Sequence, residues 1–288
     1  MEESINWHDN AAEYLQTMSS NATRRAYKHA LERFELWYRQ TYGEDPEPEL
    51  MTDQEARDWR AYLTGVKKYA ASTVNVRLSA LLGAVRFAGG HLEIDYLKQV
   101  QPPVDPLTGR QLGRLIRVVE RHTWGPVWMP LRNVAMISIM ARAGLRVSEV
   151  VALDIRDLEL RERSGWATIR QGKGMKERRA PLSLQTRKDL RAYLEEKPGD
   201  GHGELFLSRS LERLSVRAVQ KLVKRATRRA GIEDCTPHTL RHTFATRYLR
   251  QGGNIRSLQK ILGHANLETT ARYLHPTSEE ILQSVENL

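Results

Sequence analysis

The chain has 288 residues, of which 40% are hydrophobic and 28% charged, which is typical of a soluble globular protein and excludes a low-complexity chain. Its net charge of +10 favours a polyanionic partner, although a basic enzyme without such a partner is the alternative. The single cysteine excludes an internal disulfide framework, and no apolar run approaches the ~18 residues that a membrane span needs.

Helical periodicity fills the first third of the chain, and helices begin by about residue 20. Over residues 20–43 the aromatic and aliphatic side chains fall on one stripe, which predicts a helix with one buried face. A second helix is predicted to start where Thr52 and Glu55 form a capping box. A third covers residues 72–90 and ends at a glycine pair suited to a C-cap.

The polar faces of these helices carry candidate contacts to a polyanion. They are Arg24, Arg25, Lys28, Asn75 and Arg77. Each of them alone is more simply explained as a solvated surface residue, because such side chains usually face water.

A proline-rich stretch separates this helical part from the rest of the chain. Gln101–Pro106, with the sequence QPPVDP, contains three prolines in six residues, which a helix interior does not tolerate. We therefore predict a helical domain over residues 1–100, a linker over 101–106 and a second domain over 107–288.

The second domain is predicted to be mainly α with a small antiparallel β-sheet. Two helices come first, and then "WATIR" and "RRAPLS" read as short strands on either side of "QGKGMKE", a loop with two glycines. Further helices are predicted at about 185–196, 215–230, 239–251, 255–262 and 267–274. The last residues, about 278–288, have an apolar stripe that predicts a short amphipathic helix.

The stretch "CTPHTLRHTFAT" raises the question of chemistry, because helical spacing puts His238, Arg241 and His242 on one side. Cys235 and the two histidines allow a zinc reading, but the cationic Arg241 opposes a dication. A guanidinium fork beside imidazole N–H donors suits phosphate oxygens better. A solvated polar face is the third reading.

Other candidates are weak when taken singly. Arg146 follows a helix-ending glycine and has Glu149 one turn on, but such pairs are usually surface ion pairs. Lys173 lies between two glycines, as many exposed turn lysines do. A tyrosine such as Tyr273, nine positions after His264, is more often a core residue than a nucleophile.

In series these stretches are much more specific. The boxes "GLRVSE", "GKGMKER", "HTLRHTFAT" and "LGHANLETTARY" resemble, in order and spacing, those of the tyrosine recombinases or phage integrase family, most closely its compact Xer-like members. By this resemblance, six residues fall on the active-site positions and Glu149 on a supporting carboxylate. The six are Arg146, Lys173, His238, Arg241, His264 and Tyr273.

These residue types suit transesterification at a DNA phosphodiester, which needs a nucleophile, relief of negative charge and a proton for the leaving oxygen. Tyr273 can attack and hold the cut end as a 3′-phosphotyrosine. Arg146 and Arg241 can bind the non-bridging oxygens as forks, in place of metal ions. The two histidines can donate hydrogen bonds and assist proton movement. The resemblance implies that Lys173 protonates the 5′-oxygen.

The resemblance further implies a C-shaped clamp around double-stranded DNA with inverted-repeat core sites. It implies a homotetramer on two sites, formed from free monomers or weak dimers, in which the C-terminal helix docks on a neighbour. An accessory or directionality protein is a further partner. No metal or other cofactor, no ATP and no membrane partner are expected, and the protein is expected in the cytoplasm at the nucleoid.

Two alternatives stay open at this point. A type IB topoisomerase uses similar chemistry as a monomer, although the apolar C-terminal stripe argues against it. A non-catalytic DNA-binding protein on this fold is the other alternative, and the complete set of active-site residue types argues against that.

Overall fold

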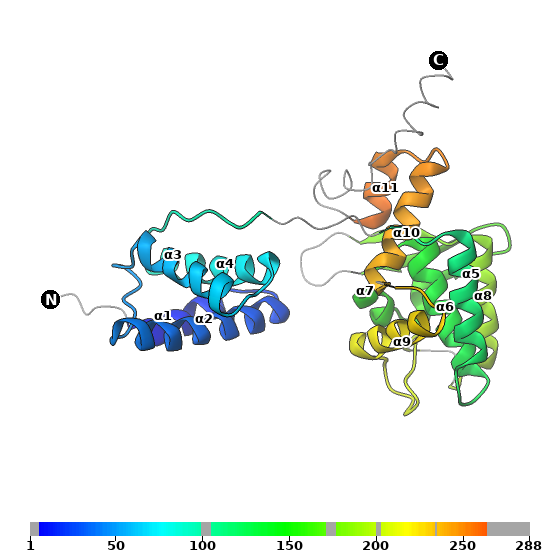
Figure 1. The fold of residues 1–288 in the computed structure, drawn as a ribbon. Helices are drawn as coiled ribbons and strands as arrows, with labels where there is room; N and C mark the ends of the chain where they lie inside the picture. The colour runs from blue at the N-terminus through cyan, green and yellow to red at the C-terminus, as the bar shows by residue number, and fades with distance from the viewer. Residues whose placement is uncertain (1–5, 99–104, 171–176, 200–202, 234, 264–288) are drawn as a thin grey trace, which may run out of the picture. The chain divides into compact units, whose positions relative to one another are not determined.

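The computed structural model describes residues 6–98, 105–170, 177–199, 203–233 and 235–263. The chain divides into two compact units, Met1–Pro102 and Pro103–Leu288 (Figure 1). Each unit has its own hydrophobic core. The helices predicted at 267–274 and 278–288 lie outside the described residues.

The first unit is helical throughout its regular structure. Its elements are α1 (Trp7–Gln16), α2 (Asn21–Tyr42), α3 (Asp53–Ala61), the π-helical turn η1 (Tyr62–Val66) and α4 (Ala71–Phe87). Aromatic side chains form the centre of its core. The centroid of the Phe34 ring lies 5.1 Å from that of Trp7 and 5.5 Å from that of Trp59. The predicted capping box of Thr52 and Glu55 is confirmed.

Helix α1 precedes the helices that the sequence indicated, the first of which covers residues 20–43. Asn6 caps it by accepting a hydrogen bond from the backbone N–H of His8 at 2.8 Å. Trp7, Ala11 and Leu15 then recur every four residues and are buried in the core of this unit. The periodicity was therefore present in the sequence, within a stretch whose polar composition obscured it.

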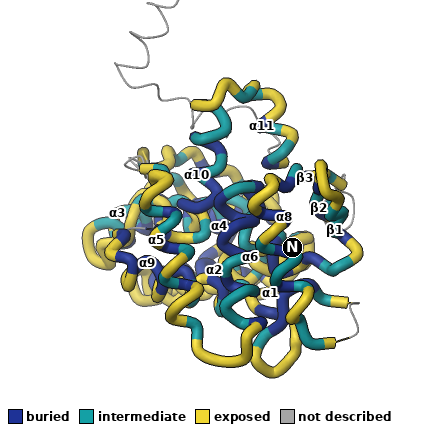
Figure 2. Tube along the Cα trace, turned by 90° about the vertical axis from the view of Figure 1, so that its right-hand side faces the viewer, coloured by how far each residue is buried: buried dark blue, intermediate teal, exposed yellow. Residues whose placement is uncertain are grey.

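The second unit is built around α6, whose residues are buried along most of its length (Figure 2). The helices are α5 (Gly109–Arg121), α6 (Trp128–Ala143), α7 (Val147–Ala152), α8 (Leu184–Glu196), α9 (Val216–Arg229), α10 (Pro237–Arg250) and α11 (Ile255–Leu262), with a 3₁₀ turn η2 (Ile155–Asp157). Helix α6 packs against α5, α8 and α10, so it holds together elements that are distant in sequence.

A small antiparallel sheet completes this unit, in agreement with the predicted fold class. Its order is β1-β2-β3, formed by Leu158–Leu160, Gly165–Ile169 and Arg178–Pro181. Trp166 pairs with Glu159 on one side and with Pro181 on the other. Strand β1 is too short to show an alternating pattern, which is why the sequence indicated only the two strands that follow it.

Among the residues that the structure describes, no helix is long and apolar enough to cross a membrane.

Candidate active site

Gly144 brings the end of α6 close to α10 and α11. It has a left-handed φ of +72°, and a Cβ at this position would collide with Phe244 and approach Leu262. A glycine is therefore needed both for the backbone conformation and for the close packing. The chain then passes through Leu145 to Arg146, which immediately precedes α7.

Arg241 is held by backbone carbonyls from two other elements. Its side chain is 2% exposed and donates from Nη1 to the Gly144 carbonyl at 2.7 Å and from Nη2 to the Leu262 carbonyl at 2.8 Å. Burying a guanidinium is costly unless its N–H groups have acceptors, so these carbonyls fix both its position and its orientation.

Glu149 binds Arg146 and is itself nearly buried, with an 8% exposed side chain. Its Oε1 accepts from Nη1 of Arg146 at 2.8 Å, and its Oε2 accepts from the Arg146 backbone N–H at 2.7 Å. Oε2 also lies 3.6 Å from Nη1 of Arg241. The structure thus brings Arg146, Glu149 and Arg241 together. The Arg146–Glu149 pair is therefore not the surface ion pair that i,i+3 spacing usually produces.

A third arginine, Arg178 on β3, also reaches this carboxylate. Its Nη2 donates to Oε2 of Glu149 at 2.7 Å, and its side chain is 10% exposed. Burial lowers the pKa of Arg178, while the nearby Glu149 opposes that shift. Sequence reasoning singled out only Lys173 from the "GKGMKER" box, although Arg178 is the last residue of that box.

The histidines and the cysteine of "CTPHTLRHTFAT" are not equivalent. His238 is exposed near the start of α10, His242 is half-buried one turn on, and Cys235 is buried before the helix. Burial raises the pKa of the Cys235 thiol to about 11, so the thiol is protonated at neutral pH and is a poor metal ligand. Within the described ranges, no three His, Cys, Asp or Glu side chains gather as metal ligands do.

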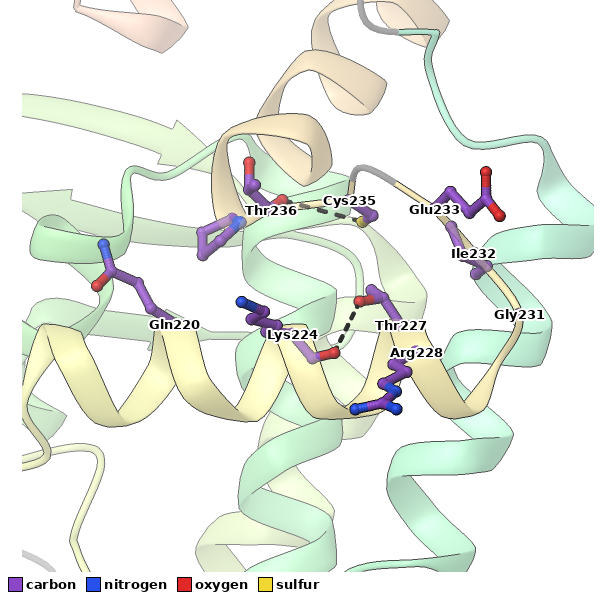
Figure 3. A pocket seen from close by; sticks show the side chains of 10 residues that line it. Gln220, Lys224, Thr227, Arg228, Gly231, Ile232, Glu233, Cys235 and Thr236 are labelled. Atoms are coloured by element: carbon purple, nitrogen blue, oxygen red, sulfur yellow. Dashed lines mark hydrogen bonds between the residues drawn. The ribbon is translucent and has the colours of Figure 1, made fainter. Parts of the chain in front are cut away.

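A hollow of about 750 Å³ lies beside the start of α10 (Figure 3). Lys224 and Arg228 of α9 line it, together with Cys235 and Thr236 from the connection to α10. Helix α9 carries six basic residues and no acidic one, and all six are exposed. Sequence reasoning missed this surface, although the run "KLVKRATRR" was a sufficient signal for it.

The five candidate contacts of the first unit do not form one surface. Arg24 and Lys28 line a hollow between α1 and α2. Arg77 lies 4.5 Å from the centre of the Tyr69 ring and lines another hollow, of about 410 Å³, on the side of α2 where Arg33 and Lys67 also lie. The basic residues on this second side are a more compact set than the one chosen from the sequence.

Each of the five candidates makes a contact within its own unit, as Asn75 and Arg25 illustrate. Both polar atoms of the Asn75 amide bond the backbone of Leu97, with Nδ2 donating to its carbonyl at 2.9 Å and Oδ1 accepting from its N–H at 2.8 Å. Arg25 is exposed and its Nε donates to the Asn21 carbonyl at 3.3 Å. Asn75 therefore fastens a loop to α4, which gives its side chain a structural purpose.

Three predicted residues, Lys173, His264 and Tyr273, lie outside the described residues. The described neighbours show where they attach. Strands β2 and β3 form the hairpin stem that flanks Lys173. Helix α11 ends at Leu262, whose carbonyl accepts from Arg241 and, at 3.4 Å, from Nη1 of Arg146. His264 thus follows, after one glycine, the residue whose carbonyl both arginines contact.

This arrangement is suited to an anionic reaction centre. Two guanidiniums, from the start of α7 and from α10, converge on one carbonyl and one carboxylate. Because they are held before any substrate binds, they can stabilise developing negative charge without reorganising. Guanidiniums also bind non-bridging phosphate oxygens as forks.

Comparison with known proteins also points to an enzyme that acts on DNA phosphates, the class suggested by the sequence motifs. The phage integrase family matches residues 106–280, and the phage integrase N-terminal SAM-like domain matches residues 9–84. The tyrosine recombinase XerA of Pyrococcus furiosus is 32% identical over 80% of this chain and 80% of its own length. The tyrosine recombinase XerC of Escherichia coli O157:H7 is 40% identical over 73% of this chain and 71% of its own.

Solved structures share the fold. The Tn1549 transposon integrase in complex with a circular intermediate DNA superposes with a TM-score of 0.77 at 20% identity, over 99% of this chain and 100% of that one. A crystal structure of XerA recombinase gives a TM-score of 0.56 at 26% identity, over 97% and 98% of the two chains. The fold and the relatives together define a tyrosine recombinase.

The chain belongs to the phage integrase family, and within that family it is Xer-like.

Proposed function

We propose that the protein is a site-specific recombinase that breaks and rejoins DNA strands with Tyr273 as its nucleophile. The observation that carries this proposal is the convergence of Arg146 and Arg241 on the Leu262 carbonyl and on Glu149. Family membership supports the reaction class, and the match of "LGHANLETTARY" to the family box supports the choice of tyrosine.

In the proposed reaction, the Tyr273 hydroxyl oxygen attacks the scissile phosphorus and the bond from phosphorus to the 5′-oxygen breaks. The product is a 3′-phosphotyrosine and a free 5′-hydroxyl, whose proton comes from Lys173. His238 and His264 donate hydrogen bonds to the phosphate and assist removal of the tyrosine proton. A 5′-hydroxyl from a second strand then reverses the step, and a Holliday junction results when one pair of strands has exchanged.

The energy of the broken ester is kept in the phosphotyrosine, so the cycle needs no ATP. The charge that develops on phosphorus is stabilised by Arg146 and Arg241, each of which can place two N–H groups on a non-bridging oxygen. In this proposal those two arginines have the charge-neutralising task that metal ions have in other phosphoryl-transfer enzymes.

The DNA itself is bound by exposed basic surfaces on both units. In the second unit the six basic residues of α9 are all exposed, and Lys224 and Arg228 line the hollow beside α10. In the first unit Arg33, Lys67 and Arg77 line one hollow. Such contacts go mostly to phosphates and set register and affinity. We accordingly assign residues 1–100 to DNA binding and 107–288 to catalysis.

The proposal is tested by trapping the covalent intermediate on a nicked DNA substrate that loses its 5′-hydroxyl fragment. Wild-type protein should form a covalent adduct, and Tyr273→Phe should bind the same DNA normally and form none. Tyr248→Phe is the matched control, because the Tyr248 ring packs 6.0 Å from Phe244 and belongs to a small hydrophobic cluster. An adduct that survives Tyr273→Phe and disappears with Tyr248→Phe would reassign the nucleophile.

The same trap separates this function from a non-catalytic DNA-binding protein, which would give no adduct with the wild-type chain. A type IB topoisomerase would give the adduct but would not exchange strands. Strand exchange between two marked DNA sites is therefore the second measurement, and relaxation of supercoiled DNA without exchange would favour the topoisomerase.

We also propose that the active assembly is a homotetramer on two inverted-repeat core sites, and that residues 278–288 dock on a neighbouring subunit. An accessory protein that sets direction fits the same scheme. The support is the apolar stripe of Ile281, Leu282, Val285 and Leu288 in a segment too short to be a stable isolated helix.

Deleting residues 279–288 should leave a folded protein that binds one half-site but does not pair sites cooperatively or recombine them. Electrophoretic mobility of complexes on one-site and two-site DNA measures this. Unfolding of the truncated chain, or undiminished cooperative assembly, would show that the segment packs within its own subunit or has no role in assembly.

A further inference from the structure

The group of charges around Glu149 contains more positive charge than the family motifs account for. Three guanidiniums, from Arg146, Arg178 and Arg241, lie within 3.6 Å of the carboxylate oxygens. The side chains of Glu149, Arg178 and Arg241 are 8%, 10% and 2% exposed, so water screens these charges little. Only Arg146, with a 34% exposed side chain, is open to solvent to a larger extent.

Arg178 has an incomplete set of hydrogen bonds for a buried arginine. Nη2 donates to Glu149, but Nε and Nη1 are buried and have no acceptor among the described residues. The guanidinium lies against Gly263, where any Cβ would collide with it, and Gly263 has a left-handed φ of +65°. A buried cation with unmade hydrogen bonds destabilises a fold, so stability alone does not explain a charged residue here.

We propose that Arg178 is a positioning residue for the transesterification: it holds Glu149 against Arg146 and supplies the second net positive charge of the phosphate-stabilising cluster. The inference rests on the proposed function, because it concerns the charge that this reaction develops.

The charge balance supports this role. Three guanidiniums against one carboxylate leave two net positive charges among the described residues of the cluster. A phosphodiester carries one negative charge, and its pentacoordinate transition state carries two. The cluster with Arg178 therefore complements the transition state more than the substrate, and only such a difference accelerates the chemical step. Without Arg178 the cluster would have one net positive charge, which equals in size the single negative charge of the substrate phosphodiester.

The geometry supports it independently. Oε2 of Glu149 accepts from Arg178 at 2.7 Å, while Nη1 of Arg241 lies 3.6 Å from the same oxygen and donates to the Gly144 carbonyl instead. If Arg178 were absent, Oε2 would keep only the Arg146 backbone N–H as a close partner and would attract Nη1 of Arg241 more strongly. Arg178 thus keeps the carboxylate occupied, so that Arg241 stays on its two carbonyls.

The test varies two charges independently: that of the side chain at position 178 and that of the scissile phosphate. Arg178→Gln removes the positive charge and keeps an N–H donor, and Arg178→Lys keeps the charge and loses the fork. Arg179→Gln is the matched control, because Arg179 is the next residue on β3, is exposed and pairs with Glu159 away from the cluster. Single-turnover cleavage is measured on a native scissile phosphate and on a methylphosphonate, which carries one negative charge less.

On the native phosphate we expect Arg178→Gln to slow cleavage by about 10–100-fold, with DNA affinity unchanged; the magnitude is that found for residues that orient the ligands of a catalytic metal, which position a reactive group in the same way. Arg178→Lys should lose less, and Arg179→Gln should match the wild type. On the methylphosphonate the loss in Arg178→Gln should shrink to about threefold or less, because the reaction then develops one negative charge fewer. The neutral ester is intrinsically easier to attack, so its cleavage stays measurable.

An equal loss on both substrates would make Arg178 an ordinary structural residue, and a wild-type rate in Arg178→Gln would remove its role altogether. If Arg178→Gln does not fold, as judged by circular dichroism, Arg178→Met takes its place, because it also removes the charge and fills a similar buried volume. A loss equal on both substrates in that variant would still reject the charge role. Failure of the wild-type protein to form an adduct would overturn the proposed function, whereas a reactive wild type with an unaffected variant overturns this inference alone.

Discussion

The two units use arginine in opposite ways. In the first unit the basic side chains lie at or near the surface, where Arg77 stacks on the Tyr69 ring and Lys28 pairs loosely with Glu32 at 3.8 Å. In the second unit Arg241 and Arg178 are almost fully buried and are fixed by backbone carbonyls and Glu149. Exposed cations attract phosphates anywhere along a duplex, whereas fixed and buried cations act only on a group placed against them.

The largest expected effect comes from the two arginines that converge on the Leu262 carbonyl. Arg241→Ala and Arg146→Ala should each lower the rate of covalent adduct formation by about 10²–10³-fold or more, the usual cost of one preorganised donor. DNA affinity should change far less, because these side chains make up a small part of the phosphate contacts. Single-turnover cleavage and equilibrium binding on the same DNA measure the two quantities. If rate and affinity fell in equal proportion, these arginines would be ordinary contacts to the DNA backbone. The two units would then not differ in how they use arginine.

Helix α9 sharpens the comparison, because it belongs to the second unit but carries exposed cations. The double substitution Lys224→Gln and Arg228→Gln should weaken DNA binding by about tenfold and reduce the slope of log K against log salt by about two. The rate of cleavage at saturating protein should remain near that of the wild type. A cleavage rate that stays low at saturating protein would show that exposed cations of the second unit also contribute to the chemical step. Burial would then not be what separates catalytic cations from DNA-binding ones.

The smallest effect is expected at Asn75, which the sequence placed among the DNA contacts and whose amide fastens Leu97 to α4. Asn75→Ala should destabilise the first unit by about 1 kcal/mol per lost hydrogen bond and leave the affinity for DNA at fixed salt unchanged. Thermal unfolding followed by circular dichroism measures the first quantity. Weaker DNA binding at fixed salt, with unchanged stability, would instead make Asn75 a DNA contact.

Sequence reasoning was most successful where the signal is local. The capping box at Thr52 and the left-handed glycine that ends α6 both depend on residues within one or two turns of each other. The residues Arg146 and Glu149 are three apart, and the order of the motifs was enough to pair them with Arg241, which the structure places beside them.

The features that the sequence did not reveal depend on distant partners. Arg178 meets Glu149 across 29 positions, after the chain has turned back through the hairpin, and no periodicity predicts such a meeting. Asn75 meets Leu97 across 22 positions, through a loop that has no repeating pattern. The basic face of α9 is a different case, because its charge run was local and visible and was overlooked.

The two carbonyls that hold Arg241 also bear on the order of events during synthesis. The contact with Gly144 spans 97 positions, and the contact between Arg146 and Leu262 spans 116, so the cluster closes only after the ribosome has released residue 262. The first unit is complete within the first 102 residues and can fold much earlier, because domains generally fold as units from the N-terminus. A nascent chain therefore completes the unit that we assign to DNA binding well before it can close the arginine cluster that we assign to catalysis.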